Sequence, residues 1–197
     1  AGVFTGNDPA GTLLAWQGWN LSGGITGVGQ HSRLPDLPAY RPDGTVPIQT
    51  RDVHLYREID GRLGRYAVGH YGHAGWLEVS VLHYDNRADP LRIEGRQYAW
   101  HTRFNHASLR LRLPGNWEVL AQGLRGETLM GPVAVQVDLA AWYVLATHAL
   151  GEASLSLRYD DFGSTDRDLT PRDPNGEQGR ALALAYAHPL SGSLTLI

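Results

Sequence analysis

Apolar and polar residues alternate with a period of two through the second half of the chain, a pattern typical of a β-strand with two unlike faces. The clearest run covers residues 133–149. Its apolar face carries Val133, Val135, Val137, Leu139, Ala141, Tyr143 and Leu145, and its polar face carries Gln136, Asp138, Trp142 and His148. We predict a long strand here, with its apolar face turned toward a core or toward lipid.

The same alternation predicts further strands. In two other runs, apolar residues, mostly Leu, alternate with polar residues. The polar residues are Ser108, Arg110 and Arg112 in one run and Ser154, Ser156, Arg158 and Asp160 in the other. The full prediction is 1–6, 63–73, 76–85, 97–113, 116–127, 133–149, 152–162, 180–188 and 193–197. Strands of soluble proteins usually have about five or six residues, whereas a strand that crosses an outer membrane needs ~9–11. Several of the predicted strands are that long.

The connections between these strands alternate in length. Short turns are expected at 73–75, 114–115, 150–152 and 189–192, and longer segments at 7–62, 86–96, 128–132 and 163–179. Outer-membrane barrels have short periplasmic turns and longer extracellular loops. We therefore predict an all-β, antiparallel, up-and-down transmembrane β-barrel, with residues 1–197 forming a single barrel segment. About 8–9 strands with open edges do not suit a closed bacterial barrel, so we expect an incomplete wall.

The segment 7–62 is too long for an ordinary connection and is expected to form a functional extracellular or pore-mouth region. Asp8 as N-cap and Pro9 at the first helical position indicate the start of a helix over 10–19. We expect this helix to lie over or inside the pore mouth. The alternative, another strand over 10–20, stays open.

Composition excludes several classes of protein. All 17 basic residues are Arg, the net charge is −3, and no basic patch suggests nucleic acid as a partner. The chain has no Cys, which excludes disulfides and thiol chemistry. No apolar stretch reaches the ~18–20 residues of a membrane helix, so a membrane would have to be crossed with strands.

Metal and catalytic chemistry find little support in the sequence. The nine His residues show no zinc-type spacing with a third ligand. Acidic residues between Asp160 and Glu177 offer oxygen ligands for Ca²⁺, but a solvated loop is the simpler expectation. His106 and Ser108, with Asp138 as a third member, are a generic arrangement without a nucleophile-elbow motif. We expect no enzyme activity, no cofactor and no metal.

Four stretches, 82–90, 97–104, 120–128 and 157–162, together resemble a proteobacterial family of porin-like outer-membrane barrels that is similar to the phosphate-selective porins. The resemblance covers about 80–188 well and the opening 7–19 moderately. It implies a larger barrel and passive diffusion rather than chemistry. The chain departs from the family by ending at Ile197, not on an aromatic residue, and by having no Lys for an anion path. The resemblance therefore does not extend to phosphate selectivity.

These observations predict a porin-type channel of the Gram-negative outer membrane for small hydrophilic solutes, with a preference for anions. The expected pore-lining residues are Arg110, Arg112, Arg158, Asp138, Asp160, Ser108, Ser154, Ser156 and Trp142. In the alternative reading, the arginines pair with Asp138 and Asp160 and only stiffen the wall. Expected partners are membrane lipid, lipopolysaccharide and hydrophilic or anionic solutes, and a homotrimer is one expected assembly. A soluble β-sandwich that binds carbohydrate or another ligand, and a plugged structural barrel, stay open as alternatives.

Overall fold

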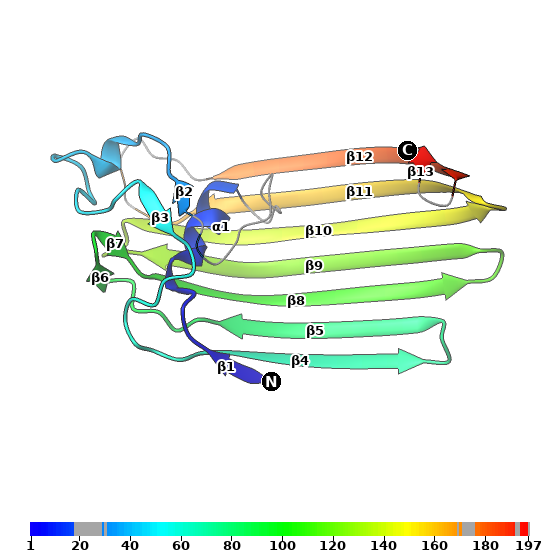
Figure 1. Ribbon diagram of the computed structural model, residues 1–197, viewed down its shortest axis with the longest axis horizontal. Helices are drawn as coiled ribbons and strands as arrows, with labels where there is room; N and C mark the ends of the chain where they lie inside the picture. Colours follow the sequence, from blue (N-terminus) through cyan, green and yellow to red (C-terminus); the bar gives the residue numbers. More distant parts are fainter. Residues whose placement is uncertain (18–28, 30, 169, 171–175, 192–193, 197) are drawn as a thin grey trace.

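One antiparallel β-sheet dominates the computed structural model, which describes residues 1–17, 29, 31–168, 170, 176–191 and 194–196 (Figure 1). Eight strands pair side by side, and a ninth, β13, adds to one edge. Their bounds are β1 Gly2–Phe4, β4 Gly64–His73, β5 Leu77–Asp85, β8 Trp100–Leu113, β9 Trp117–Met130, β10 Val135–Leu150, β11 Ala153–Asp166, β12 Glu177–Ser191 and β13 Leu194–Leu196.

The sheet is an open meander. From β4 onward each of these strands pairs antiparallel with the next one along the chain, and β1 pairs with β4. The strands β1 and β13 lie at opposite edges and do not pair with each other, so the described sheet does not close into a barrel. The predicted antiparallel up-and-down arrangement is confirmed, and so is the open wall.

Connection length separates the two ends of the sheet, as the sequence predicts. The turns after β4, β8 and β10 occupy three, three and two residues at one end, which we call the turn end (Figure 1). All longer connections lie at the other end, the loop end. Two of the turns contain successive residues with positive φ, Ala74 and Gly75 at 47° and 72°, and Gly115 and Asn116 at 77° and 62°. This backbone conformation matches the twist of the strands that such turns join.

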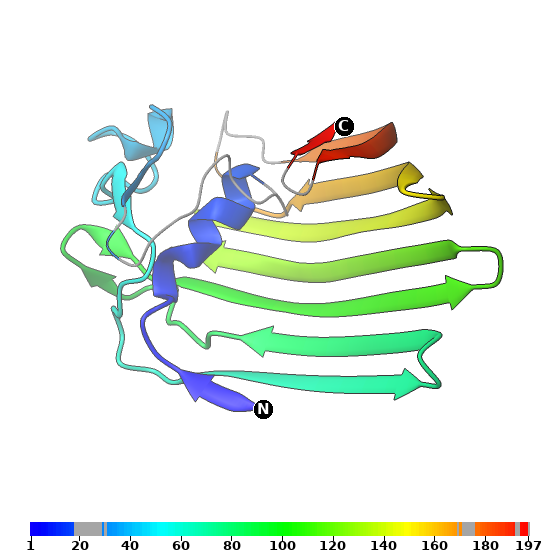
Figure 2. The same ribbon diagram turned by 45° about the vertical axis from the view of Figure 1, so that its right-hand side comes forward.

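Smaller elements gather at the loop end. They are the 3₁₀ turns η1 Asp8–Ala10 and η2 Pro38–Tyr40, the helix α1 Gly11–Gln17, and the two-stranded sheets formed by β2 His31–Arg33 with β3 Asp52–His54 and by β6 Ile93–Glu94 with β7 Gln97–Tyr98. Figure 2 shows α1 crossing the loop end over one face of the large sheet. Among the described residues, no helix is long and apolar enough to cross a bilayer.

The predicted helix over 10–19 is confirmed for Gly11–Gln17, and the strand alternative is wrong; residues 18 and 19 lie outside the described part. The predicted cap is also wrong. Asn7 is the N-terminal flanking residue of the η1 turn, and Asp8 lies inside it. The Asp8 carboxylate instead accepts hydrogen bonds from the backbone N–H groups of Ile59 (2.7 Å) and Asp60 (3.3 Å). The backbone of a distant segment therefore binds a side chain that the local sequence pattern predicts as the cap of the helix.

The two faces of the sheet differ in their surroundings. We call the side under α1 the helix face; it includes Thr102, Thr128 and Val137, which pair with one another across β8, β9 and β10. We call the other side the open face; it includes Leu109, Leu157 and Leu184. The main core lies between α1 and the helix face, where Leu14 and Ala15 pack against a buried cluster that contains Trp100, Met130, Val135, Val137 and Leu139.

The face assignment of β10 must be corrected. The sequence pattern places Val135, Val137 and Leu139 on one apolar face, which a membrane barrel would turn toward lipid, but they lie on the helix face and are at most 5% exposed. The opposite positions of the strand, Trp142 and Val144, lie on the open face and are 46% and 38% exposed. Both faces of β10 are apolar in part, because its loop-end half packs under α1 while its turn-end half continues the apolar open face. Alternation alone cannot tell these two environments apart.

Candidate functional site

The helix face holds seven of the nine predicted pore-lining residues. Cross-strand pairing places Arg110, Arg112, Arg158, Asp160, Ser108, Ser154 and Ser156 on this face, all in its turn-end half. Asp138 and Trp142 lie on the open face instead, so they do not share a face with the other seven residues. This difference follows from the reversed face of β10 described above.

Four charged side chains form an ion-pair network near the turn end. Glu118 lies 2.7 Å from Arg110 and 3.7 Å from Arg112, and Glu78 lies 3.8 Å from Arg110 and 3.4 Å from Arg112, each measured between charged nitrogen and oxygen atoms. The sequence analysis missed both glutamates. The cross-strand register identifies these glutamates as partners, since Glu78 pairs with Arg110 and Glu118 with Arg112. Two positive and two negative charges leave this network neutral.

Arg158 is neutralised within its own strand. Its Nε lies 2.9 Å from both carboxylate oxygens of Asp160, and its guanidinium carbon lies 4.0 Å above the centre of the Tyr143 ring. Stacking on an aromatic face and pairing with a carboxylate both hold an arginine in one orientation. Asp138, the other expected partner, binds Arg167 on the open face at 2.9 Å. The stiffening alternative, pairing of the arginines with carboxylates, therefore matches the geometry, although Glu78 and Glu118 take the place expected for Asp138.

Charge balance on the helix face does not favour anions. Within the described strands of the large sheet, this face carries three arginines, Arg110, Arg112 and Arg158. It carries five acidic residues, Glu78, Glu118, Asp160, Asp166 and Glu177. Acidic residues thus outnumber basic ones on this face, which argues against the predicted preference for anions.

Between and around these charges the turn-end half of the helix face carries further polar side chains, together with Leu120, Leu145 and the alanines of β12. Ser80 lies beside His70, with 2.8 Å between the hydroxyl and Nδ1, and Thr147 lies beside Ser156 at 2.9 Å between hydroxyls. Gln122 in the same half is exposed. No described element packs over this half, because α1 contacts only the loop-end portions of β8, β9 and β10. The surface offers hydrogen-bonding groups to water and small solutes.

The helix α1 approaches the sheet closely through Gly11. A Cβ atom at this position would lie 2.5 Å from Thr102 Oγ1 and 2.9 Å from Trp100 Cβ, and still closer to Thr128 Oγ1. The two threonine hydroxyls are buried and lie 2.9 Å apart, within hydrogen-bonding distance. Gly11 therefore permits the helix to seat directly on this pair and to cover the loop-end half of the face.

An acidic cluster ties the start of α1 to the segment before β4. One carboxylate oxygen from each of Asp8, Glu58 and Asp60 lies within 4.8 Å of the others. Burial, with the nearby charges of Asp60 and Glu58, raises the pKa of Asp8 to about 6, against the lowering effect of the hydrogen bond from Ile59. Burial would also raise the pKa of Glu58, but hydrogen bonds from the Gly6 and Gly61 N–H groups and from Asp8 lower it. Backbone donors hold these side chains, so the cluster serves as an anchor.

Neither of the other candidate sites is assembled. Asp160 and Asp161 are successive strand residues on opposite faces, where they pair with Arg158 and Arg180 respectively. They do not converge on a Ca²⁺ site; Asp173 lies outside the described residues. Asp138 is on the face opposite His106 and Ser108, so the generic hydrolase arrangement is not formed.

Comparisons with known proteins give no indication of the function, which must therefore be inferred from the geometry. No family model, no curated protein and no solved structure matches this chain. The resemblance to porin-like barrels is thus a prediction that rests on the sequence stretches named above. What the structure adds is a two-faced antiparallel sheet with a hydrophilic half-face on one side and an apolar face on the other.

Proposed function

We propose that this chain forms part of the wall of a Gram-negative outer-membrane β-barrel, a porin-type channel for passive diffusion of small hydrophilic solutes. The observation that carries the proposal is the open face, a continuous apolar surface that no described element covers. Six predicted outward leucines, Leu109, Leu111, Leu155, Leu157, Leu182 and Leu184, share this face. Leu182 and Leu184 are 72% and 71% exposed.

The energetics favour a lipid environment for this face. Burial of one Leu side chain contributes about 1.5–3 kcal/mol, so six leucines left in water forgo roughly 10 kcal/mol, as much as the whole stability of many domains. Apolar patches of this extent mark surfaces that contact membranes or other proteins. Acyl chains cover such a face without requiring a complementary protein shape.

The height of the apolar surface suits an outer membrane. Along β8 it runs from Ala107 to Leu113, and along β9 from Trp117 to Gly123, which is about 20 Å at ~3.4 Å per residue. Outer-membrane barrels carry an outward apolar band about 25 Å tall, flanked by aromatic residues. At the turn-end border Trp117 stacks on His148, with 4.5 Å between ring centres.

Toward the loop end the open face becomes polar, and three of its arginines are paired with carboxylates. The nitrogen–oxygen distances are 3.3 Å for Arg65–Asp85, 2.7 Å for Arg103–Glu127 and 2.9 Å for Arg180–Asp161. Such a border is expected where the apolar band meets the headgroup region. We propose that the loop end is extracellular, as the longer connections of outer-membrane barrels are.

The hydrophilic half of the helix face then lines the lumen. Its neutral ion-pair networks lead us to propose weak selectivity, without the anion preference expected from the arginines alone. Both edges of the sheet must be paired in the membrane, because unpaired backbone groups in lipid cost several kcal/mol each. Similarity to phosphate-selective porins and assembly as a homotrimer stay predictions.

Two alternatives make different demands. A soluble sandwich needs a second sheet over the open face, and the described part of the chain provides none. A plugged structural barrel is favoured by one observation, the tight seat of α1 on Thr102 and Thr128. Conductance distinguishes a plugged barrel from a channel.

The test is single-channel recording with the purified full-length protein in a planar bilayer. We expect stepwise, ohmic conductance in 1 M KCl. Insertion without conductance would support the plugged barrel and contradict the channel. Failure to enter the bilayer, with the protein monomeric in detergent-free buffer, would contradict the membrane location altogether.

Orientation is tested by cysteine labelling, for which the absence of native Cys is an advantage. Leu91 lies in a loop-end connection and is 60% exposed, whereas Glu152 lies in a turn-end connection. We expect Leu91→Cys to react with a membrane-impermeant maleimide on intact cells, and Glu152→Cys to react only after lysis. The reverse pattern would mean that the loop end faces the periplasm.

A further inference from the structure

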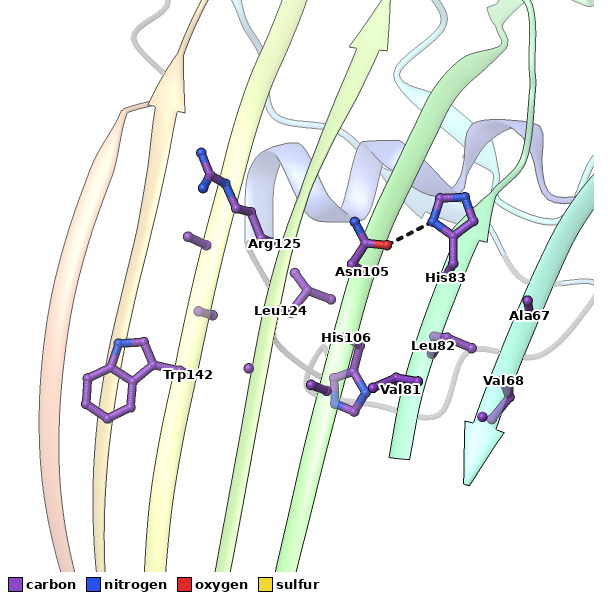
Figure 3. A pocket seen from close by; sticks show the side chains of 15 residues that line it. Ala67, Val68, Val81, Leu82, His83, Asn105, His106, Leu124, Arg125 and Trp142 are labelled. Carbon is purple, nitrogen blue, oxygen red and sulfur yellow. Dashed lines mark hydrogen bonds between the residues drawn. The ribbon is translucent and has the colours of Figure 1, made fainter. Parts of the chain in front are cut away.

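The open face contains a shallow depression at the border between its apolar and polar parts. Small residues of three neighbouring strands form its floor, namely Ala107 of β8, Gly123 of β9 and Ala140 of β10. The hollow measures about 760 Å³. Val81 and Trp142 also line it, and Figure 3 shows the Trp142 ring at its side. Between the side chains of Val81 and Trp142, the floor carries nothing larger than a methyl group, which leaves room for a narrow apolar chain.

Three polar residues lie at the loop end of this depression. His83, Asn105 and Arg125 are consecutive in one cross-strand row of β5, β8 and β9. His83 Nδ1 and Asn105 Oδ1 lie 2.9 Å apart, which occupies these two atoms with each other, as the dashed line in Figure 3 marks. Arg125 stands next to them with its guanidinium at the edge of the hollow (Figure 3).

Arg125 differs from every other arginine in the described strands of the large sheet. Arg65, Arg103, Arg110, Arg112, Arg158 and Arg180 each have an acidic partner within 4.0 Å. Arg125 makes no hydrogen bond or ion pair with any residue that the structure describes. Its nearest acidic neighbour along the strand on the same face, Glu127, is already bound to Arg103 at 2.7 Å. An exposed, unpaired cation beside an apolar hollow suits a ligand that carries both an anionic group and an apolar chain.

We propose that this depression binds one phosphorylated acyl lipid of the membrane, with its phosphate on Arg125 and an acyl chain over Ala107 and Gly123, between Val81 and Trp142. Arginine suits phosphate because its planar guanidinium donates two parallel hydrogen bonds. Trp142 lies at the level where indole rings favour the membrane interface. The inference rests on the proposed membrane location of the open face. Because the site is at the loop-end border of the apolar surface, it faces the outer leaflet in the proposed orientation, and lipopolysaccharide is the lipid that presents this chemistry there.

The experiment is native mass spectrometry of the full-length protein from detergent micelles, titrated with purified lipopolysaccharide. We expect one bound lipid per chain for the unmodified protein. Arg125→Gln should weaken binding by about tenfold, the effect of losing a hydrogen bond to a charged group. The matched control is Arg180→Gln, which removes an exposed but paired arginine from the same face and should leave binding unchanged. A second variant, Ala107→Phe, fills the floor while keeping Arg125 and should also weaken binding.

Competition separates the possible ligands. A zwitterionic phosphatidylcholine that binds as well as lipopolysaccharide would overturn the role of charge, and full displacement of the lipid by inorganic phosphate would overturn the role of the acyl chain. A dimer without bound lipid would place a second copy of the chain on the hollow and overturn the proposal. Bilayer insertion of each variant is measured separately. If Arg125→Gln inserts and binds lipid normally, this inference fails while the proposed channel stands; if the unmodified protein does not insert, both fail.

Discussion

At the scale of single residues, cross-strand neighbours decide what a side chain does. Arg110 and Arg112 read from their own strand as a positive ladder, but Glu78 and Glu118 on the adjacent strands neutralise them. Arg125 resembles the other arginines of a polar border, yet among the arginines in the described strands of the large sheet it alone lacks a described partner. The role of a charged residue in a sheet can therefore be inferred only when its cross-strand neighbours are known.

Leu157 tests the open face directly. It is 48% exposed in the middle of the apolar surface. We expect Leu157→Arg to destabilise the protein in lipid vesicles by roughly 2–4 kcal/mol, because an arginine near the bilayer midplane must be taken out of water. Chemical unfolding in vesicles measures this cost. The control is Gln122→Arg on the hydrophilic helix face, which should change stability little; equal effects of the two substitutions would contradict the assignment of faces.

Asp8 predicts a dependence of stability on pH. Folding raises the pKa of its buried carboxyl from 3.8 to about 6, so this group stabilises the fold fully below pH 3.8 and loses that contribution as the pH rises through about 6. The pKa of Glu58 is lowered from 4.5, so this group stabilises the fold above pH 4.5 and loses that contribution only at lower pH. Between pH 5 and 8 we expect protection of α1 against hydrogen exchange to fall in the unmodified protein and to change less in Asp8→Asn. Asp43→Asn, at an exposed position, should behave like the unmodified protein; a flat profile in the unmodified protein would contradict the prediction.

At the scale of elements, the strands follow from alternation, the turns from their residues and the helix from the signal at Pro9, while the position of the helix on the sheet follows from its contacts. Tight turns at Ala74–Gly75 and Gly115–Asn116 connect strands whose lengths the sequence predicts within a few residues. Aromatic rings also shape the sheet: Phe104 lies against Gly126 and Phe162 against Gly179 on the neighbouring strands, where a larger residue would clash. These pairs help to fix the register.

Gly11 tests the seat of α1. A Cβ at this position cannot be accommodated without a shift of the helix or of Thr102 and Thr128. We expect Gly11→Ala to displace α1 and to change single-channel conductance, upward if the helix narrows the lumen. Gly29→Ala is the matched control, because a Cβ there meets nothing within 4 Å. Identical conductance in Gly11→Ala and the unmodified protein, with loss of α1 protection confirmed, would show that the helix does not restrict the path.

At the scale of the whole molecule, the two faces impose different chemistry on one wall. The open face combines an apolar surface with a polar border in which all described arginines but Arg125 are paired, as expected for a lipid-facing surface. The helix face combines a covered core at the loop end with a neutral hydrophilic half at the turn end. The path for solutes is therefore proposed along the turn-end half, past Arg110, Glu118 and Arg158.

Ion selectivity follows from this balance. We expect the unmodified full-length protein to give a reversal potential near zero or slightly cation-selective in a KCl gradient. Arg110→Gln with Arg112→Gln should shift it toward cations by leaving Glu78 and Glu118 unpaired, and Glu78→Gln with Glu118→Gln should shift it equally toward anions. Reversal potentials of both double variants that match the unmodified protein, with conductance retained, would show that this network does not line the path.

The sequence by itself determined the long antiparallel strands, the alternation of short and long connections, the open wall and the helix after Pro9. These features depend on interactions within a strand, a turn or a hairpin, which the residue pattern records. Only the tertiary structure decided which face of β10 is buried, that Asp8 anchors a distant segment instead of capping a helix, and that Glu78 and Glu118 neutralise the arginines. The reason is physical: burial and charge pairing depend on which strand or segment comes to lie alongside, and a period of two describes each strand alone.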